Sequence, residues 1–579
     1  MQPMKLNWRI FFALTLLAVG VASAATLDVT SIADSGPGTL RDALANAADG
    51  DTINAAWVHG TIRLTSGELF VSQNVVITGP GPNNLTVDGN YLNSVFHIGS
   101  NVVAKLTGLT ITHGAGDDIG GGIYNDHAML TLINCAIINN FGGGGGAGIS
   151  NEGYFGSATL NLVNSLVANN TNFVESSSGG GILNDAQDGI ATVTLEKSIV
   201  RDNSTGYLGG GIFNDGFDGN ATVVVVNSTL KNNNAYGSGG GIYNAGWSGT
   251  ASVTLENSTV TENQAGTGGG VYNAGYGGTA LVIITNCAIT DNRCLYYGGG
   301  GGLFNGISGG SALMKLANST ISENSADFAG GIFSGEDYVV PIIGPGDASL
   351  QILNCTISDN LAEAIYLVNG AGTGTVEIGS TIINASTLGS TISSGSSLVT
   401  SLGYNLSSDD GGGVLTNATD LINTDPRLGP LRDNGGPTWT QALLPDSPAI
   451  DQGKNFSGSP FDQRGHRFAR TFDNPFIPNA TGGDGTDIGA FEVQTINPAQ
   501  PVQYLLTLVN SQVNHPRSLR VILDAALTSI NRNNLFATFY ELEAFQKQVR
   551  VQVMPSDHAL AAVLLQTAQD AINSLNTER

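Results

Sequence analysis

The sequence predicts a mainly β protein, a parallel β-helix with coils of about 30 residues, followed by a small α-helical bundle. A two-part phrase returns eight times along the chain, and a fixed period indicates stacked structural units of one kind. The chain has 579 residues, of which 80 are Gly and only 12% are charged, a composition that argues against disorder. In the last part of the chain the Gly-rich phrases stop, and apolar residues recur at helical spacing.

Residues 1–24 read as an export signal. Lys5 and Arg9 supply the positive region, residues 10–21 are apolar, and Ala22-Ser23-Ala24 is a small-residue cleavage site. We expect cleavage near Ala24 and a secreted or cell-surface location. An uncleaved anchor is the alternative, which the short apolar run disfavours, and no transmembrane segment is expected in the mature chain. The net charge of −25 argues against nucleic acid as a partner.

Residues 96–400 are predicted to form the repeated coils. β-favouring runs such as residues 221–226 and 280–284 alternate with turns rich in Gly, Asn and Asp. These runs are too short and too rich in Gly and Asn for paired helices. We expect three short strands and three turns in each coil, so that equivalent residues of successive coils form columns.

Asparagine recurs at two points of each unit, and we expect its side-chain amides to hydrogen-bond from coil to coil. The Gly triplets that precede the first point suit corners that need a positive φ. In the first half of the unit the column contains Asn125, Asn151, Asn184, Asn214, Asn244, Asn273, Asn305 and Ser334. In the second half the first asparagine falls at Asn134, Asn164, Asn227, Asn257, Asn286, Asn318 and Asn354, with Lys197 standing in once.

The four cysteines are predicted to be unpaired. Cys135, Cys287 and Cys355 occupy the position that Ser holds in other units, so they belong to one column of small residues. Cys287 and Cys355 are two coils apart, roughly 9–10 Å at strand spacing, which exceeds the roughly 7 Å that a disulfide tolerates. Cys294 lies off this column. We expect buried thiols rather than disulfides or metal ligands.

Two parts of the chain resemble bacterial secreted proteins. Residues 25–53, with Thr-Ser-Ile-Ala-Asp-Ser-Gly-Pro-Gly-Thr-Leu-Arg-Asp-Ala-Leu, resemble the opening of right-handed β-helix proteins, in which a strand and a helix, here about 39–48, cap the first coil. This resemblance implies a right-handed parallel β-helix with a cap and first coils at 25–95. The Gly-Gly-Gly-Ile phrases and later Asn pairs are similar to the repeats of polymorphic outer-membrane adhesins.

A third part resembles the choice-of-anchor Q module. The resemblance lies in four stretches taken in order, at residues 425–438, 444–453, 462–465 and 487–492, with Leu-Pro-Asp-Ser-Pro-Ala-Ile-Asp-Gln-Gly as the second. It implies a terminal module at 401–495 of an exported protein.

Residues 496–579 are predicted to form three or four packed helices. Pro501, Pro516 and Pro555 punctuate this segment, and Ser556 is the expected N-cap of the last helix. The phrases between Ser518 and Gln552 resemble the small helical FIMAH-type domain, which implies a fold and an extracellular location only. Apolar residues recur at helical spacing at Leu519, Ile522, Leu523, Ala526, Leu527 and Ile530.

Two aromatic columns are candidates for ligand binding, because sugar rings stack on exposed aromatic faces. The alternative for both is ring stacking between coils, which stabilises any solenoid. One column contains Tyr124, Phe213, Tyr243, Tyr272, Phe304 and Phe333. The other, in the next turn, contains Tyr154, Phe217, Trp247 and Tyr276, and it is the candidate ligand-binding set.

An acidic column precedes the second aromatic column. Asp126, Glu152, Asp185 and Asp215 occupy one position on four successive coils. Stacked carboxylates repel each other unless water or a cation screens them, so calcium is a possible cofactor. Its hypothetical ligands are Asp185, Asp188, Asp215 and Asp218. The alternative is a solvated acidic turn, since turns favour Asp in any case.

No catalytic residue is assigned. Parallel β-helices include pectate lyases, which need a strong base, usually Arg or Lys. No two of the cations between residues 120 and 360 form a cationic pocket in the sequence; these cations are Lys197, Arg201, Lys231, Arg293 and Lys315. We therefore predict an exported, non-catalytic, adhesin-like interaction protein whose partner is a polysaccharide or another surface protein. The alternative is a carbohydrate-active protein, either polysaccharide-binding or similar to pectate lyases and polygalacturonases.

Overall fold

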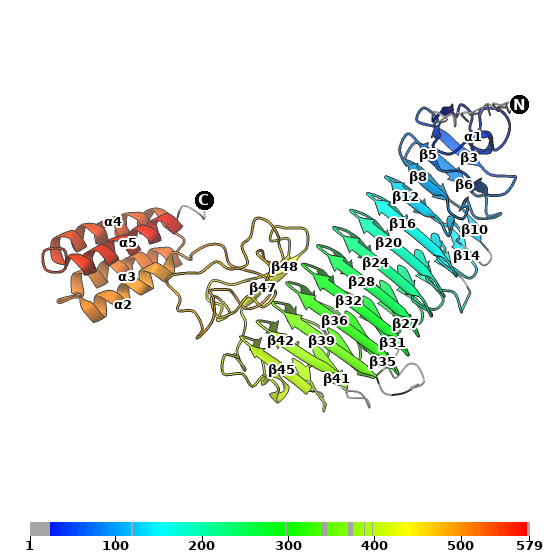
Figure 1. Ribbon diagram of the computed structural model, residues 1–579. Coiled ribbons are helices and arrows are strands. Elements are labelled where there is room, and N and C mark those ends of the chain that lie inside the picture. The colour runs from blue at the N-terminus through cyan, green and yellow to red at the C-terminus, as the bar shows by residue number, and fades with distance from the viewer. Residues whose placement is uncertain are drawn as a thin grey trace, which may run out of the picture.

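The computed structural model describes residues 24–116, 120–172, 174–295, 298–336, 344, 346–368, 374–386, 388–395 and 398–575 (Figure 1). Residues 1–23 of the expected export signal lie outside them. The chain forms a long stack of β coils, then an irregular segment beside the stack, then a helical bundle.

The β coils build four parallel sheets, which we name A to D. Strands follow in the order C, A, B and D around a central coil, so these coils have four strands and not the expected three. The two-residue strands of sheet D are the fourth strands, which the sequence did not predict. Neighbouring strands within each of the four sheets are parallel, which confirms the parallel β-solenoid.

Sheet A has 14 strands. They are β1 (Thr26–Asp28), β2 (Thr52–Asn54), β5 (Val75–Thr78), β8 (Val103–Thr107), β12 (Met129–Ile133), β16 (Ser157–Val163), β20 (Ile190–Glu196), β24 (Asn220–Val226), β28 (Thr250–Glu256), β32 (Thr279–Thr285), β36 (Ser311–Ala317), β39 (Asp347–Leu353), β42 (Thr375–Gly379) and β45 (Leu398–Gly403).

Sheet B has 13 strands. They are β3 (Gly60–Arg63), β6 (Leu85–Asp88), β9 (Thr110–Thr112), β13 (Ala136–Ile138), β17 (Leu166–Ala168), β21 (Ile199–Arg201), β25 (Thr229–Lys231), β29 (Thr259–Thr261), β33 (Ala288–Thr290), β37 (Thr320–Ser322), β40 (Thr356–Ser358), β43 (Ile382–Ile383) and β46 (Leu406–Ser407).

Sheet C has 12 strands. They are β4 (Leu69–Val71), β7 (Phe96–Ile98), β11 (Ile123–Asp126), β15 (Ile149–Glu152), β19 (Ile182–Asp185), β23 (Ile212–Asp215), β27 (Ile242–Trp247), β31 (Val271–Tyr276), β35 (Leu303–Ser308), β38 (Ile332–Glu336), β41 (Ile365–Val368) and β44 (Ile392–Ser393). Sheet D contains β10 (Ala115–Gly116), β14 (Phe141–Gly142), β18 (Thr171–Asn172), β22 (Ser204–Thr205), β26 (Asn234–Ala235), β30 (Gln264–Ala265) and β34 (Arg293–Cys294).

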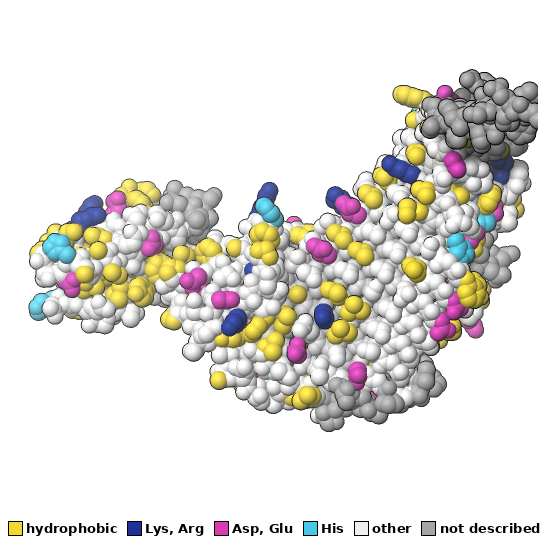
Figure 2. Space-filling model, viewed as in Figure 1, with side chains coloured by type: hydrophobic (Ala, Val, Ile, Leu, Met, Phe, Trp, Pro, Cys, Tyr) yellow, Lys and Arg dark blue, Asp and Glu magenta, His cyan; other side chains and the backbone are white. Residues whose placement is uncertain are grey.

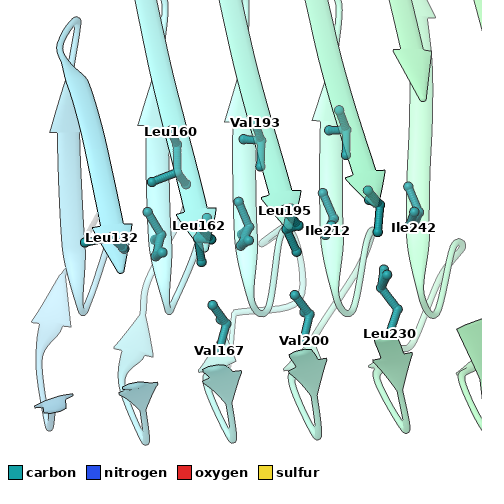
Figure 3. Close-up of a cluster of buried hydrophobic side chains, with 14 of the residues drawn as sticks. Leu132, Leu160, Leu162, Val167, Val193, Leu195, Val200, Ile212, Leu230 and Ile242 are labelled. Carbon is teal, nitrogen blue, oxygen red and sulfur yellow. The ribbon is translucent and has the colours of Figure 1, made fainter. Parts of the chain in front are cut away.

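Aliphatic side chains from sheets A, B and C fill the interior of the stack (Figure 3). In one coil Val193 and Leu195 of β20, Val200 of β21 and Ile212 of β23 all have 0% exposure. Each such burial contributes about 1.5–3 kcal/mol, and the contribution repeats with every coil. The repeated phrase therefore encodes one continuous core.

Two buried asparagine ladders run along the stack. In the first, the Nδ2 of Asn184 donates to the Oδ1 of Asn214 at 2.7 Å, as the first-half column predicts. The second ladder uses the last asparagine of the phrase, where the Nδ2 of Asn203 donates to the Oδ1 of Asn233 at 3.0 Å. These bonds satisfy amides that are closed off from water.

The first asparagine of the second half has a conformational role besides the expected one. Its column adopts a left-handed backbone, with φ of 50° at Asn227 and at Lys197. Asparagine tolerates this conformation better than most residues, and the side chain points outward, so Lys is accepted at 197. This conformation is common to the column, and the expected amide bond between coils occurs in it where the Asn286 Nδ2 donates to the Asn257 Oδ1 at 3.2 Å.

All four cysteines are buried and unpaired, as predicted. In the small-residue column, the hydroxyl or thiol of one coil accepts a hydrogen bond from the backbone of the coil before it. The N–H of Cys287 donates to the Ser319 Oγ at 3.1 Å, and the N–H of Ser258 to the Cys287 Sγ at 3.5 Å. Cys and Ser are interchangeable here because each offers a small acceptor.

A helix covers the first coil. Helix α1 (Leu40–Asn46) begins after Thr39, whose Oγ1 accepts a hydrogen bond from the N–H of Asp42 at 3.2 Å. Leu40, Ala43 and Leu44 are buried against the core. This is the helix expected within 39–48.

Residues 425–495 turn back and cover the later strands of sheet B. This covering segment contains one antiparallel pair, β47 (Leu428–Arg432) with β48 (Thr440–Leu443), and follows the short 3-10 helix η1 (Gly411–Gly413). Gln463 ties it down, since its Oε1 accepts from the Thr320 Oγ1 at 2.6 Å and its Nε2 donates to the Cys287 oxygen at 3.0 Å. Figure 1 shows the segment beside the stack.

The motif residues of the covering segment hold its irregular backbone. Asp462 accepts hydrogen bonds from the Arg464 guanidinium, and from the N–H of Glu492 at 2.9 Å. The carboxylate of Asp487 accepts from the N–H groups of Asp451 and Val493 at 2.8 and 2.7 Å. Side chains thus replace the strand ladders that this segment lacks.

The last part of the chain forms four helices with a core of their own. They are α2 (Ala499–Gln512), α3 (Arg517–Asn531), α4 (Leu535–Gln552) and α5 (His558–Ser574). The N-cap of α5 is Asp557 and not Ser556, because the Asp557 Oδ1 accepts from the N–H of Leu560 at 2.9 Å, while the Ser556 hydroxyl donates to Val553. Within the described residues, no helix has the length and apolar character needed to cross a membrane.

Candidate functional site: the outer face of sheet C

The outer face of sheet C carries two columns of side chains. In each strand the isoleucine, such as Ile212 or Ile242, points into the core, so the next residue and the third after it point outward. Strand register aligns the first outward column as Phe70, His97, Tyr124, Ser150, Leu183, Phe213, Tyr243, Tyr272, Phe304, Phe333 and Tyr366. The second outward column contains Asp126, Glu152, Asp185, Asp215, Ala245, Ala274 and Gly306.

The later coils of this face are filled by a stack of rings. The centroids of Tyr243 and Tyr272 are 4.8 Å apart with an interplanar angle of 9°, and those of Tyr272 and Phe304 are 4.6 Å apart at 2°. Tyr272, Phe304 and Phe333 have 0% exposure. The first aromatic column therefore stabilises the solenoid through ring stacking, the alternative raised from the sequence.

The second aromatic column is not a continuous ladder. Tyr154 and Phe217 are 43% and 39% exposed, whereas Tyr276 is 1% exposed. The Tyr276 hydroxyl lies 2.8 Å from that of Tyr272, and its ring stacks on half-buried Trp247 at 4.0 Å. Gln187 takes the position between Tyr154 and Phe217. Burial removes Tyr276 from a ligand's reach, and only the early members of the column face solvent.

Exposed aromatic residues also line the opposite edge of the face. Because all strands of sheet C are parallel, residues that precede them gather at one edge and residues that follow them at the other. Tyr207 and Tyr236, which precede β23 and β27, are 49% and 71% exposed. Phe155, which follows β15, is 68% exposed and contacts Tyr154 with centroids 4.3 Å apart. We call Tyr207 and Tyr236 the leading rim, and Tyr154, Phe155 and Phe217 the trailing rim.

Sequence reasoning did not single out Tyr207, Tyr236 or Phe155. The two tyrosines each stand within three residues before a Gly triplet, so an alignment of that position across the repeats could have found them. Phe155 follows a residue that was selected, but its left-handed φ of 52° could not be read from the repeat.

A hydrogen-bonded network of carboxylates and imidazoles occupies the first coils of the face. The His97 Nδ1 lies 2.9 Å from the Glu68 Oε1, and its Nε2 lies 3.8 Å from the Asp126 Oδ2. The Ser100 hydroxyl and the His127 imidazole also contact Asp126. Burial opposes ionisation of Asp126, but these hydrogen bonds and the two imidazoles lower its pKa below the usual value.

The imidazole of His127 is held by two acceptors. Partial burial favours its neutral form, yet the Tyr154 carbonyl and the Asp126 carboxylate together raise the pKa of His127. Neither His97 nor His127 was a candidate in the sequence, because neither belongs to a repeated column.

The next three carboxyls have raised pKa values. Burial, followed by the charge of Asp185, raises the pKa of Glu152 to about 7, and burial with the same neighbour raises that of Asp215 to about 7. Burial also raises the pKa of Asp185. Ser150 donates to Glu152, and the N–H groups of Gln187 and Phe217 donate to Asp185 and Asp215 at 2.8 and 3.0 Å. Glu152 and Asp185 also share a side-chain hydrogen bond. Near neutral pH this row is therefore only partly ionised.

The structure does not gather the hypothetical calcium ligands at one point. Asp185 and Asp215 are half-buried on strands, while Asp188 and Asp218 are exposed at left-handed corners with φ of 53° and 46°. Nowhere in the described ranges do three or more His, Cys, Asp or Glu side chains form a group that could hold a metal ion. The corner conformation separates the two pairs, which the shared spacing in the sequence did not indicate.

These features define a parallel β-solenoid with an aromatic-rimmed, acidic face. No family model and no curated protein match the chain. Among solved structures, the chain is similar to the pectate lyase Pel9A, with 13% identity, a TM-score of 0.34, and coverage of 82% of this chain and 97% of that one. It is also similar to a mannuronic acid-specific family 6 polysaccharide lyase from human gut microbiota, with 11% identity, a TM-score of 0.26, and coverage of 62% and 78%. Both similarities are too distant to carry an argument about activity.

Proposed function

We propose that this protein is exported and binds a polysaccharide along the outer face of sheet C. The observation that carries the proposal is the pair of exposed aromatic rims on either side of half-buried polar side chains. Sugars combine apolar ring faces with hydroxyl edges, so aromatic platforms beside hydrogen-bonding groups suit them. The coil repeat offers equivalent positions along the stack, which suits a polymer more than a single small ligand.

The expected export signal and the resemblance to the choice-of-anchor Q module support a location outside the cytoplasm. Attachment to a glycan of this kind would also serve adhesion, the role implied by the resemblance of the repeats to outer-membrane adhesins.

The test is affinity electrophoresis of the full chain in gels that contain soluble polysaccharides, followed by titration calorimetry with any that retard it. The double variant Tyr154→Ala, Phe217→Ala should lose most of the retardation, and so should Tyr207→Ala, Tyr236→Ala. Trp57→Ala is the matched control, because Trp57 is 86% exposed but lies on the first coil away from both rims. Retardation that survives both double variants while their folds stay intact would contradict the proposal.

A second candidate is cleavage of the bound glycan by acid–base catalysis. The observation that favours it is the pairing of Asp126 with Glu152 in adjacent strands, with pKa values displaced in opposite directions. Such a pair can supply a base and a proton donor at the same pH. Release of reducing ends from the bound polysaccharide, abolished in Glu152→Gln, would support it; binding without release would leave the binding function alone.

A further inference from the structure

We propose that the polysaccharide bound on sheet C carries free amino groups, and that uronic acid polymers are rejected. This inference rests on the proposed function and adds the class of glycan. It comes from the distribution of charge around the two aromatic rims.

Sheet C and the turns on both sides of it contain no Lys or Arg from the second coil to β27. This holds for residues 64–75, 89–103, 113–129, 139–157, 169–190, 202–220 and 232–250. Most cations of these coils lie on sheets A and B and their connections, at Arg63, Lys105, Lys197, Arg201 and Lys231. Arg41 of α1 donates to the carbonyls of Gly67 and Glu68 before β4, and its charge is paired with Asp34. Figure 2 shows few, scattered Lys and Arg side chains on the face in view, across which Figure 1 labels the strands of sheet A.

The same stretch is rich in carboxyls. Glu68, Asp126, Glu152, Asp185 and Asp215 lie on or beside the face, and Asp188 and Asp218 are exposed next to the trailing rim. His97 and His127 are the groups of this face that can become positive, and both already contact carboxylates. A ligand therefore meets excess negative charge, and no Lys or Arg of sheet C or its turns as far as β27 is available to pair with a uronate.

The consequence for a uronic acid polymer is unfavourable. Its carboxylates would lie within a few ångströms of Asp126, Glu152 or Asp185, where like charges repel most strongly because the side chains are half-buried. A neutral glycan avoids this cost and can hydrogen-bond to the row through its hydroxyls, but it forms no charge-assisted bond there.

An ammonium group, in contrast, is attracted by the carboxyl row. Glu152, Asp185 and Asp215 stand on successive strands, about 4.8 Å apart. Glu152 and Asp185 share a side-chain hydrogen bond, whereas Asp215 accepts only the N–H of Phe217 among the bonds of the described residues. An ammonium between Asp185 and Asp215 would form charge-assisted hydrogen bonds with both and favour the ionised carboxyls. The aromatic rims add cation–π attraction for the same ligand.

The experiment compares three soluble probes on the full-length protein by titration calorimetry: a glucosamine hexamer, the N-acetylglucosamine hexamer and a galacturonate hexamer. Near neutral pH, where the carboxyl row and the amines are both partly charged, we expect the glucosamine hexamer to bind at least about tenfold tighter than its acetylated form, and the galacturonate hexamer to bind weakest.

A cationic probe can also bind an acidic protein without specificity, so two double variants are needed. Asp185→Asn, Asp215→Asn keeps the side-chain oxygens that accept backbone hydrogen bonds, and should erase the preference for free amines. Asp291→Asn, Glu323→Gln is the matched control, because it removes two exposed carboxyls from successive corners after sheet B and should leave the preference intact.

If both double variants lose the preference for free amines equally, the attraction is non-specific and the inference is overturned. Tighter binding of the galacturonate hexamer would overturn it too, but would leave polysaccharide binding standing. If neither the glucosamine, acetylated nor galacturonate probe binds, and no polysaccharide retards the protein in gels, the proposed function itself fails.

Discussion

At the residue scale, each coil uses asparagine in two ways. Asn214, Asn244 and Asn273 belong to a buried ladder in which every amide both donates and accepts. Asn227 stands at an exposed left-handed corner, where backbone conformation governs the choice of residue. Substitutions at the two kinds of position should therefore differ widely in cost.

Asn244→Ala should lower the free energy of unfolding by about 1 to 3 kcal/mol, because it removes one acceptor of the Asn214 amide and leaves the buried Asn273 Oδ1 without its ladder donor. Asn227→Lys, which copies the residue found at 197, should change it by less than about 0.5 kcal/mol. Urea unfolding followed by circular dichroism measures both. Equal losses of unfolding free energy in the two variants would contradict the distinction between the buried ladder and the left-handed corners.

The carboxyl row should make stability depend on pH. Glu152 titrates near 4.5 when unperturbed and near 7 in the fold, so between these values the folded state holds a proton that the unfolded state has released. Raising the pH through this window therefore removes stability, and the loss ends above about 7.

Glu152→Gln should remove part of this pH dependence, about 1 to 2 kcal/mol between pH 5 and 7.5. The measurement is the melting temperature of variant and wild type across that range. The comparison must be relative, because buried Asp451 and Asp487, whose pKa values burial raises to about 7, act in the same direction in both proteins. If the melting temperatures of the variant and the wild type change with pH in parallel, Glu152 does not contribute to the pH dependence of stability.

At the element scale, the ring stack stabilises the later strands of sheet C. Tyr272→Ala should cost about 3 to 5 kcal/mol, since it empties a fully buried site between two stacked rings. Tyr272→Phe keeps the ring and removes the hydroxyl, which lies 2.8 Å from that of Tyr276, and should cost about 0.5 to 1.5 kcal/mol. Tyr154→Ala, at an exposed ring, serves as the control in the same thermal unfolding experiment.

The covering segment is held to sheet B by side chains. Gln463→Ala should speed proteolysis within 425–495 while the melting of the coils stays unchanged, because Gln463 bonds both to the solenoid and to Trp439 of the segment. Gln494→Ala is the control, since its amide donates only within the segment, to Ala469 and Glu492. Limited proteolysis with mass spectrometry distinguishes the two.

At the scale of the whole molecule, the solenoid and the helical bundle have separate cores. Between the covering segment and the bundle, the Asn474 Nδ2 donates to the Gln500 Oε1 at 2.7 Å and the Phe476 ring meets Tyr504. We expect calorimetry to show two transitions, and deletion of 499–575 to remove one without shifting the other. A single transition that vanishes on deletion would contradict independent folding.

Much of the solenoid followed from the repeat. The period specified which residues become neighbours, so the ladder from Asn125 to Asn305 and the thiol column of Cys287 were predicted correctly. The fourth strand of each central coil was missed, because two residues such as Ser204 and Thr205 are too short a run to show a periodicity.

The candidate site was predicted less well. The acidic and aromatic columns were located, but their exposure was not, and Tyr276 and Tyr154 look equivalent in the repeat although one is buried and the other exposed. His97 and Glu68 were missed because they meet only when two coils stack.

The sequence by itself determined the coil, its period and the residues that stack, because each coil contacts chiefly the coils next to it and a fixed period specifies those contacts. Only the tertiary structure decided which faces remain open. Residues 425–495 return to cover Thr320 and Thr356 of sheet B, through contacts between residues more than 130 positions apart. Burial depends on such distant partners, and no local repeat encodes them.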